Sequence, residues 1–343
     1  MFFCDPFGHT FPENLFNHGA SVTDLNYIFF HDQEPIHLDI HRPLFEAVVT
    51  RSLDCNDPHG PKQGAIVTSE LDSEFVEQVC STYNWRPYYY FFHGWAALDW
   101  YRGYDKTFLI TPPEQRKIKH TFLAPNRIIA GKRLHRLEML YHIFRNRLLN
   151  NHISCPVTCP AENISIHQAI KPLVAKYPDI ESVFANTLLP LQFKDETDHP
   201  MHSCWLSLFN ESADSLLYLV TETVAQGRRQ HITEKTFKPI ALGMPFVLVG
   251  TQGSLKYLRS YGFKTFDSVW DESYDDEPDD VRIERIGSLL RSLDELSVAG
   301  KQELFEQCWP IIQHNWNHFY NGGFEQVLWQ ELQDMLEQIR KDF

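Results

Sequence analysis

The sequence predicts an α/β protein whose strands form parallel sheets in two domains, followed by closing helices. Short apolar runs end repeatedly in polar residues, as Leu216–Val220 does before Thr221–Thr223. Segments with helical spacing lie between these runs, which is the order of a parallel sheet with crossover helices. A chain of 343 residues that is 43% hydrophobic is long enough to bury two cores.

Charge and composition narrow the classes of function. The net charge of −14 argues against a protein that coats nucleic acid by charge alone, although the basic segments Arg116–Lys119 and Arg127–Arg147 leave room for a local basic cleft. The seven scattered cysteines favour a reducing compartment and structural thiols. No apolar run reaches about 18 residues, and the first residues lack the pattern of a secretory signal. We therefore expect a cytoplasmic protein with no membrane partner. For a viral protein, this location would be the cytoplasm of the host cell.

The first predicted domain, residues 1–120, alternates strand-like and helix-like segments. The expected strands are Leu25–Phe30, Gly64–Val67 and Tyr88–Phe92, and the expected helices are Pro43–Val49 and Glu70–Tyr83. Each strand ends in polar residues, and parallel strands bring these ends to one edge of the sheet. His31, Asp32 and Glu34 follow the first strand, and His93 follows the third. They are candidates for proton transfer, and the alternative is that they cap and position loops.

The second predicted domain, residues 121–280, begins with a strand at Thr121–Leu123 and a basic helix start. Candidate anion ligands in this stretch are Arg127, Arg133 and Arg136. Positive side chains at a helix N-terminus oppose the helix dipole, so a bound anion would balance them. The alternative is a solvated basic helix end.

The segment from Ser215 to Lys264 organises this domain. Its expected elements are the strand Leu216–Val220, a helix from Glu234 to Gly243 capped by Thr233, the strand Pro245–Val249, and a turn through Gly253 to a helix capped by Ser254. Polar groups at the carboxyl ends of parallel strands, beside helix N-termini, are where α/β proteins hold anionic ligands.

Glu234 and Lys235 lie in the first turn of the helix after Thr233. A carboxylate there suits a ribose diol and an ammonium suits a phosphate. The alternative is a solvated ion pair beside an N-cap. Arg228 and Arg229 add positive charge to the preceding loop. Farther along, we expect the acidic run Asp271–Asp280 to be a solvated loop, with no metal site, and residues 281–343 to form helices that pack back on the body.

The stretch from Glu222 to Gly250 resembles the donor-binding segment of fucosyltransferase-like glycosyltransferases with two Rossmann-like domains, the GT-B type. The matching positions are Glu222, Ile232-Thr233-Glu234-Lys235, Ala241, Gly243, Pro245 and Gly250. Around these positions, the match covers about fifty residues well and another thirty weakly. The loop Val224–His231 is longer and more basic than the family pattern.

The resemblance implies two Rossmann-like domains whose parallel sheets face each other across a cleft. It also implies transfer of a sugar from a UDP- or GDP-linked donor to a hydroxyl, without a metal or any cofactor besides the donor. Glu234 would hold the ribose, and Lys235 with Arg133 or Arg136 would face the diphosphate; spacing does not decide between the two arginines. A base near His31–Glu34, or His93, would activate the acceptor.

The acceptor stays open at this point. A glycan or a small molecule fits the acidic chain. Modified, hydroxymethylated DNA is a variant, as in the base glycosyltransferases of bacteriophages, because a basic face can hold a strand or a flipped base. The alternative from another class is a non-catalytic module of the same fold that binds a nucleotide or nucleic acid.

Overall fold

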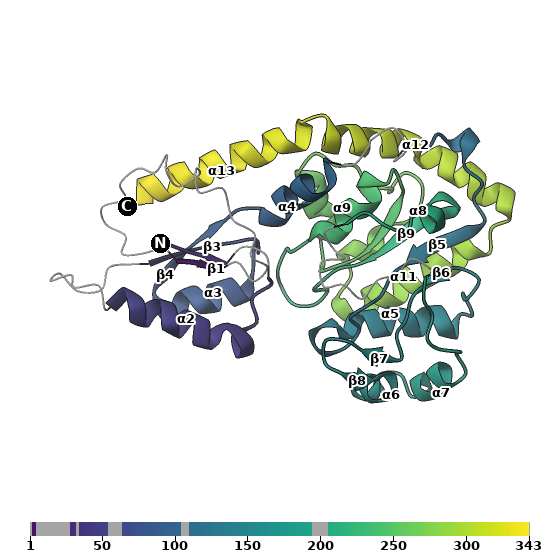
Figure 1. The fold of residues 1–343 in the computed structure, drawn as a ribbon, viewed down its shortest axis with the longest axis horizontal. Helices are drawn as coiled ribbons and strands as arrows, with labels where there is room; N and C mark the ends of the chain where they lie inside the picture. The colour runs from purple at the N-terminus through teal and green to yellow at the C-terminus, as the bar shows by residue number, and fades with distance from the viewer. Residues whose placement is uncertain are drawn as a thin grey trace. The chain divides into compact units, whose positions relative to one another are not determined.

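The computed structural model describes residues 2–4, 28–31, 34–53, 64–103, 110–193 and 205–342. The chain forms two compact units, drawn in Figure 1. Unit 1 comprises Met1–Ala96, Gly227–His231 and Glu325–Phe343, and unit 2 comprises Ala97–Gln226 and Ile232–Phe324. Each unit has its own parallel sheet, so the predicted α/β class is confirmed.

The sheet of unit 1 has four parallel strands in the order β1-β2-β3-β4. Its elements are β1 (Phe2–Cys4), β2 (Ile28–His31), α2 (Leu38–Leu53), β3 (Gly64–Thr68), α3 (Glu74–Tyr83), β4 (Trp85–Tyr89), α4 (Phe92–Tyr101), which continues into unit 2, and α13 (Gly323–Asp342). Helices α2 and α3 cover one face of the sheet, and α13 covers the other.

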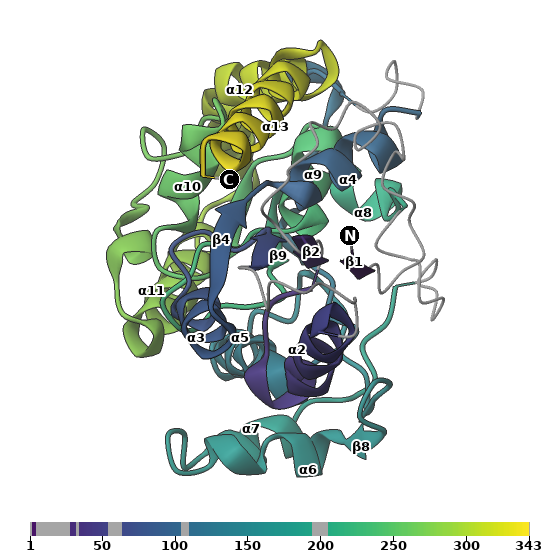
Figure 2. The ribbon, with the colours of Figure 1, turned by 90° about the vertical axis from the view of Figure 1, so that its left-hand side faces the viewer.

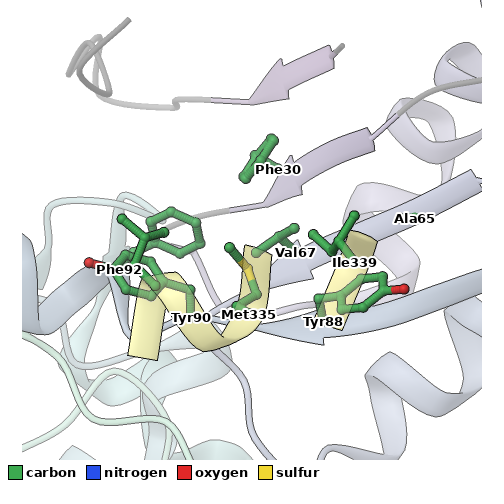
Figure 3. Close-up of a cluster of buried hydrophobic side chains, with 9 residues drawn as sticks. Phe30, Ala65, Val67, Tyr88, Tyr90, Phe92, Met335 and Ile339 are labelled. Carbon is green, nitrogen blue, oxygen red and sulfur yellow. The ribbon is translucent and has the colours of Figure 1, made fainter. Parts of the chain in front are cut away.

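The strands of unit 1 direct alternate side chains to these two helical layers, as the period of a β-strand requires. Phe29 and Ile66 pack in the cluster on the α2 and α3 side. Phe30 and Val67 pack against α13, where Ile339 belongs to the same buried cluster (Figure 3). Because both faces are covered by helices, the central strands β2 and β3 are apolar up to their last residue, which is the pattern the sequence presented.

The predicted strand Tyr88–Phe92 is placed three residues too late. The observed strand β4 is Trp85–Tyr89, and α4 begins at Phe92. The predicted strand began after Pro87, a residue that has no N–H to donate to a sheet. β4 is an edge strand, however, and an edge tolerates a proline.

The sheet of unit 2 also has four parallel strands, in the order β10-β9-β5-β6. The strands are β5 (His120–Ala124), β6 (His152–Ile153), β9 (Ser215–Thr221) and β10 (Phe246–Val249), and β7 (Thr158–Cys159) pairs antiparallel with β8 (Ile164–Ser165). The predicted strands at Leu216–Val220 and Pro245–Val249 are thus found within one residue of their predicted ends. β6 was not predicted, since two residues are too few to leave a periodic signal.

Helices cover both faces of this second sheet. The longer ones are α5 (Leu134–Arg145), α9 (Glu234–Ala241), α11 (Asp279–Asp294) and α12 (Val298–Tyr320). In Figure 1, α5 and α11 lie on one side of the sheet, and α9 and α12 lie on the other. This double layer buries the strands and leaves their two ends, the amino and carboxyl edges, for polar residues.

Shorter helices complete unit 2. They are η1 (Pro113–Gln115), η2 (Gly131–Arg133), α6 (Ile166–Ala169), η3 (Lys171–Leu173), α7 (Ile180–Ala185), α8 (Phe209–Ala213), α10 (Ser254–Ser260) and η5 (Ser273–Asp276). Figures 1 and 2 agree that β8, α6 and α7 lie together beyond α5, on the side away from the sheet. Among the described residues, no helix combines the length and apolar character needed to cross a bilayer.

Candidate functional site

The carboxyl edge of the sheet in unit 2 collects the polar side chains predicted to bind a ligand. Strand β9 ends at Thr221 and is followed by Glu222, and Asn126 follows the end of the neighbouring strand β5. The two strand ends are joined directly, because Thr221 Oγ1 donates to Asn126 Oδ1 over 3.1 Å. Asn126 is buried, and its N–H also donates to Ser154 Oγ at 2.8 Å.

Glu222 is fully buried, and its carboxylate fixes the start of α9. Oε1 accepts from Thr233 N at 3.0 Å and from Thr236 Oγ1 at 2.6 Å. Oε2 accepts from Thr223 N at 3.1 Å and from Thr233 Oγ1 at 2.6 Å. Each oxygen thus takes one main-chain N–H and one hydroxyl, which stabilises a carboxylate away from water. Glu222 and Thr233 therefore shape the site rather than offering free groups to a ligand.

Glu234 and Lys235 follow this anchor in the first turn of α9. Thr233 is the N-cap, and its hydroxyl accepts from Lys235 N. Lys235 Nζ contacts Glu234 Oε1 at 2.7 Å and Thr223 Oγ1 at 3.1 Å. The side chain of Glu234 is 6% exposed and that of Lys235 is 28% exposed. Of the two, the ammonium is the group that an incoming ligand can reach.

Arg136 and its neighbour His135 hold the main chain of the site. Arg136 is buried and donates to three carbonyl oxygens, those of Ile128, Thr221 and Glu222, at 2.9 to 3.1 Å. Burial, helped by the charge of Arg133, lowers the pKa of Arg136 to about 9, which leaves it charged near neutral pH. His135 Nε2 lies 2.9 Å from Glu222 O, so the ring must carry its proton there.

Arg133 ends η2 directly before α5 and is differently placed. It is half-buried, and its Nε finds no hydrogen-bond partner among the described residues. Burial is the main cause of the lowered pKa of His135 and of Arg136, and the charge of Arg133 adds to both shifts, so its guanidinium lies near them. Arg127, half-buried, follows Asn126 at the same strand end. Arg136 is thus committed to the main chain, whereas Arg133 retains donor capacity for an anion.

The turn through Gly253 and Ser254, predicted to contact the donor, is occupied by the protein itself. The Asp275 carboxylate accepts from Leu255 N at 3.0 and 3.1 Å and from Lys256 N at 3.3 Å, and Asp275 O accepts from Gly253 N. Ser254 Oγ donates to Thr251 O at 2.7 Å. The first amides of α10 are therefore satisfied by a side chain, and this geometry gives no support to an anion at that helix.

The same finding corrects part of the expectation that the acidic run Asp271–Asp280 is a solvated loop: Asp271, Asp276 and Asp280 are exposed, but two other acidic residues are not. Glu272 and Asp275 are buried within it. Glu272 Oε1 accepts from Phe266 N at 2.8 Å, and burial raises the pKa of Glu272 to about 7. Asp275 caps α10, and Glu272 holds the loop at Phe266 by a hydrogen bond. The composition of the run did not indicate these roles.

Arg282 is a residue of the site region that sequence reasoning missed. Its buried guanidinium donates to Gly250 O at 3.0 Å, to Ala225 O at 2.8 Å and to Glu277 O at 2.6 Å. It joins the segments that follow β9 and β10. Its position in an ordinary first helical turn, after Asp279 and Asp280, gave no signal of that role.

The residues predicted to act as a base lie in unit 1. His31 is buried at the end of β2; burial, together with the nearby His41, lowers its pKa to about 3. Glu34 is half-buried in the segment that leads to α2, and Asp32 lies outside the described residues. His93 is buried in the first turn of α4, where its ring packs against His231 at 4.9 Å between centroids. With its lowered pKa, His31 is a poor proton acceptor near neutrality.

The basic loop after β9 does not add free positive charge. Arg229 Nη1 lies 3.0 Å from Glu70 Oε1, and this pair is buried in unit 1. Arg228 Nη2 lies 2.5 Å from Glu77 Oε2 on α3. Glu70 also accepts from Ile36 N at 2.6 Å, so it is a structural hub that the sequence analysis passed over. Both arginines are therefore neutralised within unit 1.

Comparisons with known proteins add no family to this description. The chain matched no protein-family model, no curated protein and no solved structure.

Proposed function

We propose that the chain is a glycosyltransferase that moves a sugar from a UDP- or GDP-linked donor to a hydroxyl acceptor. The observation that carries the proposal is the set of cations at the carboxyl edge of the sheet in unit 2. Lys235 is partly exposed, Arg133 has unused donor capacity, and no carboxylate of the described residues forms an ion pair with Arg133. A diphosphate supplies the negative charge that such a group favours.

The buried residues around these cations support the same proposal. Glu222 fixes the start of α9, and Arg136 fixes the ends of β9 and of the segment at Ile128. A site held by buried groups keeps its donors in place before the ligand arrives, which is how a leaving diphosphate is stabilised without reorganisation. We assign the diphosphate contact to Lys235 and Arg133, and a positioning role to Arg136.

A ribose contact at Glu234 requires a change in the present contacts of that side chain. Its side chain is almost fully buried and already contacts Lys235 Nζ. A ribose diol would have to replace part of that contact. For the base, we propose Glu34 or Asp32 in place of His31, because burial lowers the pKa of His31 to about 3 and shields its ring, whereas Glu34 is only half-buried.

The first experiment is a thermal-shift panel of the full chain with UDP, GDP, CMP and TDP. A shift with one diphosphate identifies the base that is read, and absence of any shift contradicts the proposal. Lys235→Ala should weaken that binding by roughly tenfold or more, since it removes a charge-assisted contact. Lys256→Ala is the matched control, because Lys256 is an exposed lysine of the same unit on α10.

The second experiment separates the two arginines and tests turnover. Arg133→Ala should reduce nucleotide binding while the fold stays intact, and Arg291→Ala, at an exposed position of α11, should change nothing. Hydrolysis of UDP- or GDP-sugars without acceptor supports an enzyme. Nucleotide binding with no turnover toward glycans, small alcohols or hydroxymethylated DNA would instead favour a non-catalytic binding module.

A further inference from the structure

The amino edge of the same sheet brings together two histidines and an aspartate that the function above does not use. His120 begins β5, His152 begins β6, and Asp214 directly precedes β9. Their ligand atoms all lie within 4.8 Å of one another. We propose that these three residues bind a divalent transition-metal ion of the zinc class.

The hydrogen bonds of His120 prepare it as a ligand. Its Nδ1 lies 2.7 Å from Asn150 O, and a carbonyl can only accept, so Nδ1 carries the proton of the neutral ring. The lone pair of Nε2 then faces Asp214 Oδ2 at 3.9 Å, which is too long for a hydrogen bond. His120 Nε2 and Asp214 Oδ2 are both acceptors, so neither can donate to the other, and a cation bound by both would be stabilised. Metal-bound histidines are held in this way, by a carbonyl on the other ring nitrogen.

His152 completes the set, and its ring lies beside that of His120 with 4.2 Å between the centroids. Its Nε2 lies 2.8 Å from Asp214 Oδ1, as a hydrogen bond in the metal-free chain. Bonds of about 2.0–2.1 Å in a tetrahedral zinc site put ligand atoms about 3.3 Å apart. The distances of 2.8 and 3.9 Å bracket that value, so small side-chain rotations suffice. Metal binding would replace the proton shared by His152 and Asp214.

Rigidity and access both suit a metal site. The three residues sit at the starts of three hydrogen-bonded strands, so the main chain fixes their separation. Their side chains are 22 to 26% exposed, which gives an ion a path in and leaves a fourth position for water. Imidazole and carboxylate donors without a thiolate fit zinc, cobalt or nickel better than calcium or magnesium.

The site is separate from the proposed donor site. β9 (Ser215–Thr221) separates Asp214, which precedes it, from Glu222, which follows it, and eight positions of extended chain span about 26 Å. The ion would therefore clamp β5, β6 and β9 at their starts and would not touch the diphosphate. Lys119 Nζ, 3.3 Å from Asp214 Oδ2, is a competing cation at the site.

The test is a titration of the chelator-treated full chain with Zn²⁺ by calorimetry and with Co²⁺ by visible absorption. We expect one equivalent to bind, with a tetrahedral Co²⁺ spectrum that lacks a thiolate charge-transfer band. Asp214→Asn and His152→Ala should each weaken binding by about 10- to 100-fold or more. Exposed His167→Gln is the control and should leave affinity unchanged.

Lys119→Met provides an independent arm, because removing the competing cation should tighten Zn²⁺ binding by several-fold while the ligands stay in place. The proposal is overturned if the chain binds no equivalent of Zn²⁺, or if binding is the same in the Asp214, His152 and His167 variants. It is also overturned if Co²⁺ gives a thiolate band, since the ion would then be held by cysteines elsewhere.

Discussion

Glu222→Gln tests whether the buried carboxylate holds the site together. Each carboxylate oxygen accepts one main-chain N–H, from Thr233 to Oε1 and from Thr223 to Oε2. An amide has one oxygen and one NH₂ group, so whichever way it is turned, the NH₂ faces a main-chain donor that cannot rotate away. The variant therefore loses one main-chain hydrogen bond and places its NH₂ group against a main-chain N–H, which repels it.

The expected loss of stability follows from these bonds. One main-chain and at least one hydroxyl bond to a charged acceptor are lost, at about 1.5–3 kcal/mol each. Relief from burying a charge offsets part of this, so we expect a net loss of about 2–4 kcal/mol. Urea unfolding of the full chain measures it, and hydrogen exchange at the amides of Thr223 and Thr233 localises it.

The matched control is Glu284→Gln, at an exposed position of α11, which should stay within about 0.5 kcal/mol of the unmodified chain. A Glu222→Gln chain that is equally stable, with unchanged exchange at both amides, would refute the reasoning. In that case the four contacts would contribute nothing net, and the start of α9 would depend on other residues.

Three further predictions concern stability, each measured by urea unfolding. Ile339→Ala should cost about 2–5 kcal/mol by opening a cavity between α13 and its sheet, and exposed Lys341→Ala should cost almost nothing. Glu70→Gln should cost about 3–5 kcal/mol by leaving Arg229 buried without its partner, and adding Arg229→Met should recover part of the loss. Burial raises the pKa of Glu272 to about 7, so the folded state holds that proton more tightly than the unfolded state. Stability is then lost as pH rises toward 7, and the advantage of Glu272→Gln should grow by about 2 kcal/mol between about pH 5 and about pH 8; a constant difference would contradict it.

The sequence predicted the architecture better than the site. The strands at Gly64–Val67, Leu216–Val220 and Pro245–Val249 were found because buried parallel strands are short, continuous apolar runs that end in polar or turn-forming residues. The strand at Trp85 was misplaced because aromatic residues continue past its end without a polar break. Glu70 and Arg282 were missed because their partners are main-chain atoms and side chains far away in the sequence, which no local pattern encodes.

The choice between Arg133 and Arg136 shows what kind of information the sequence lacked. The two residues are three positions apart at one helix start, so both suit an anion equally by spacing. The structure separates them by their acceptors, since Arg136 donates to Ile128, Thr221 and Glu222 carbonyls. Carbonyl acceptors are invisible in a sequence, because every residue has one.

This separation decides how site variants should be interpreted. Arg136, on α5, donates to the main-chain carbonyl of Glu222, and the side chain of Glu222 accepts from Thr233 N at the start of α9. The buried residue Glu222 therefore links α5, the end of β9 and α9. Replacing Arg136 or Glu222 would therefore disturb folding and ligand binding together. Lys235 and Arg133 lie outside that chain of contacts to the main chain, with part of each side chain accessible. Loss of nucleotide binding with unchanged unfolding is thus diagnostic at Lys235 and Arg133, and the same loss at Arg136 would carry no such meaning.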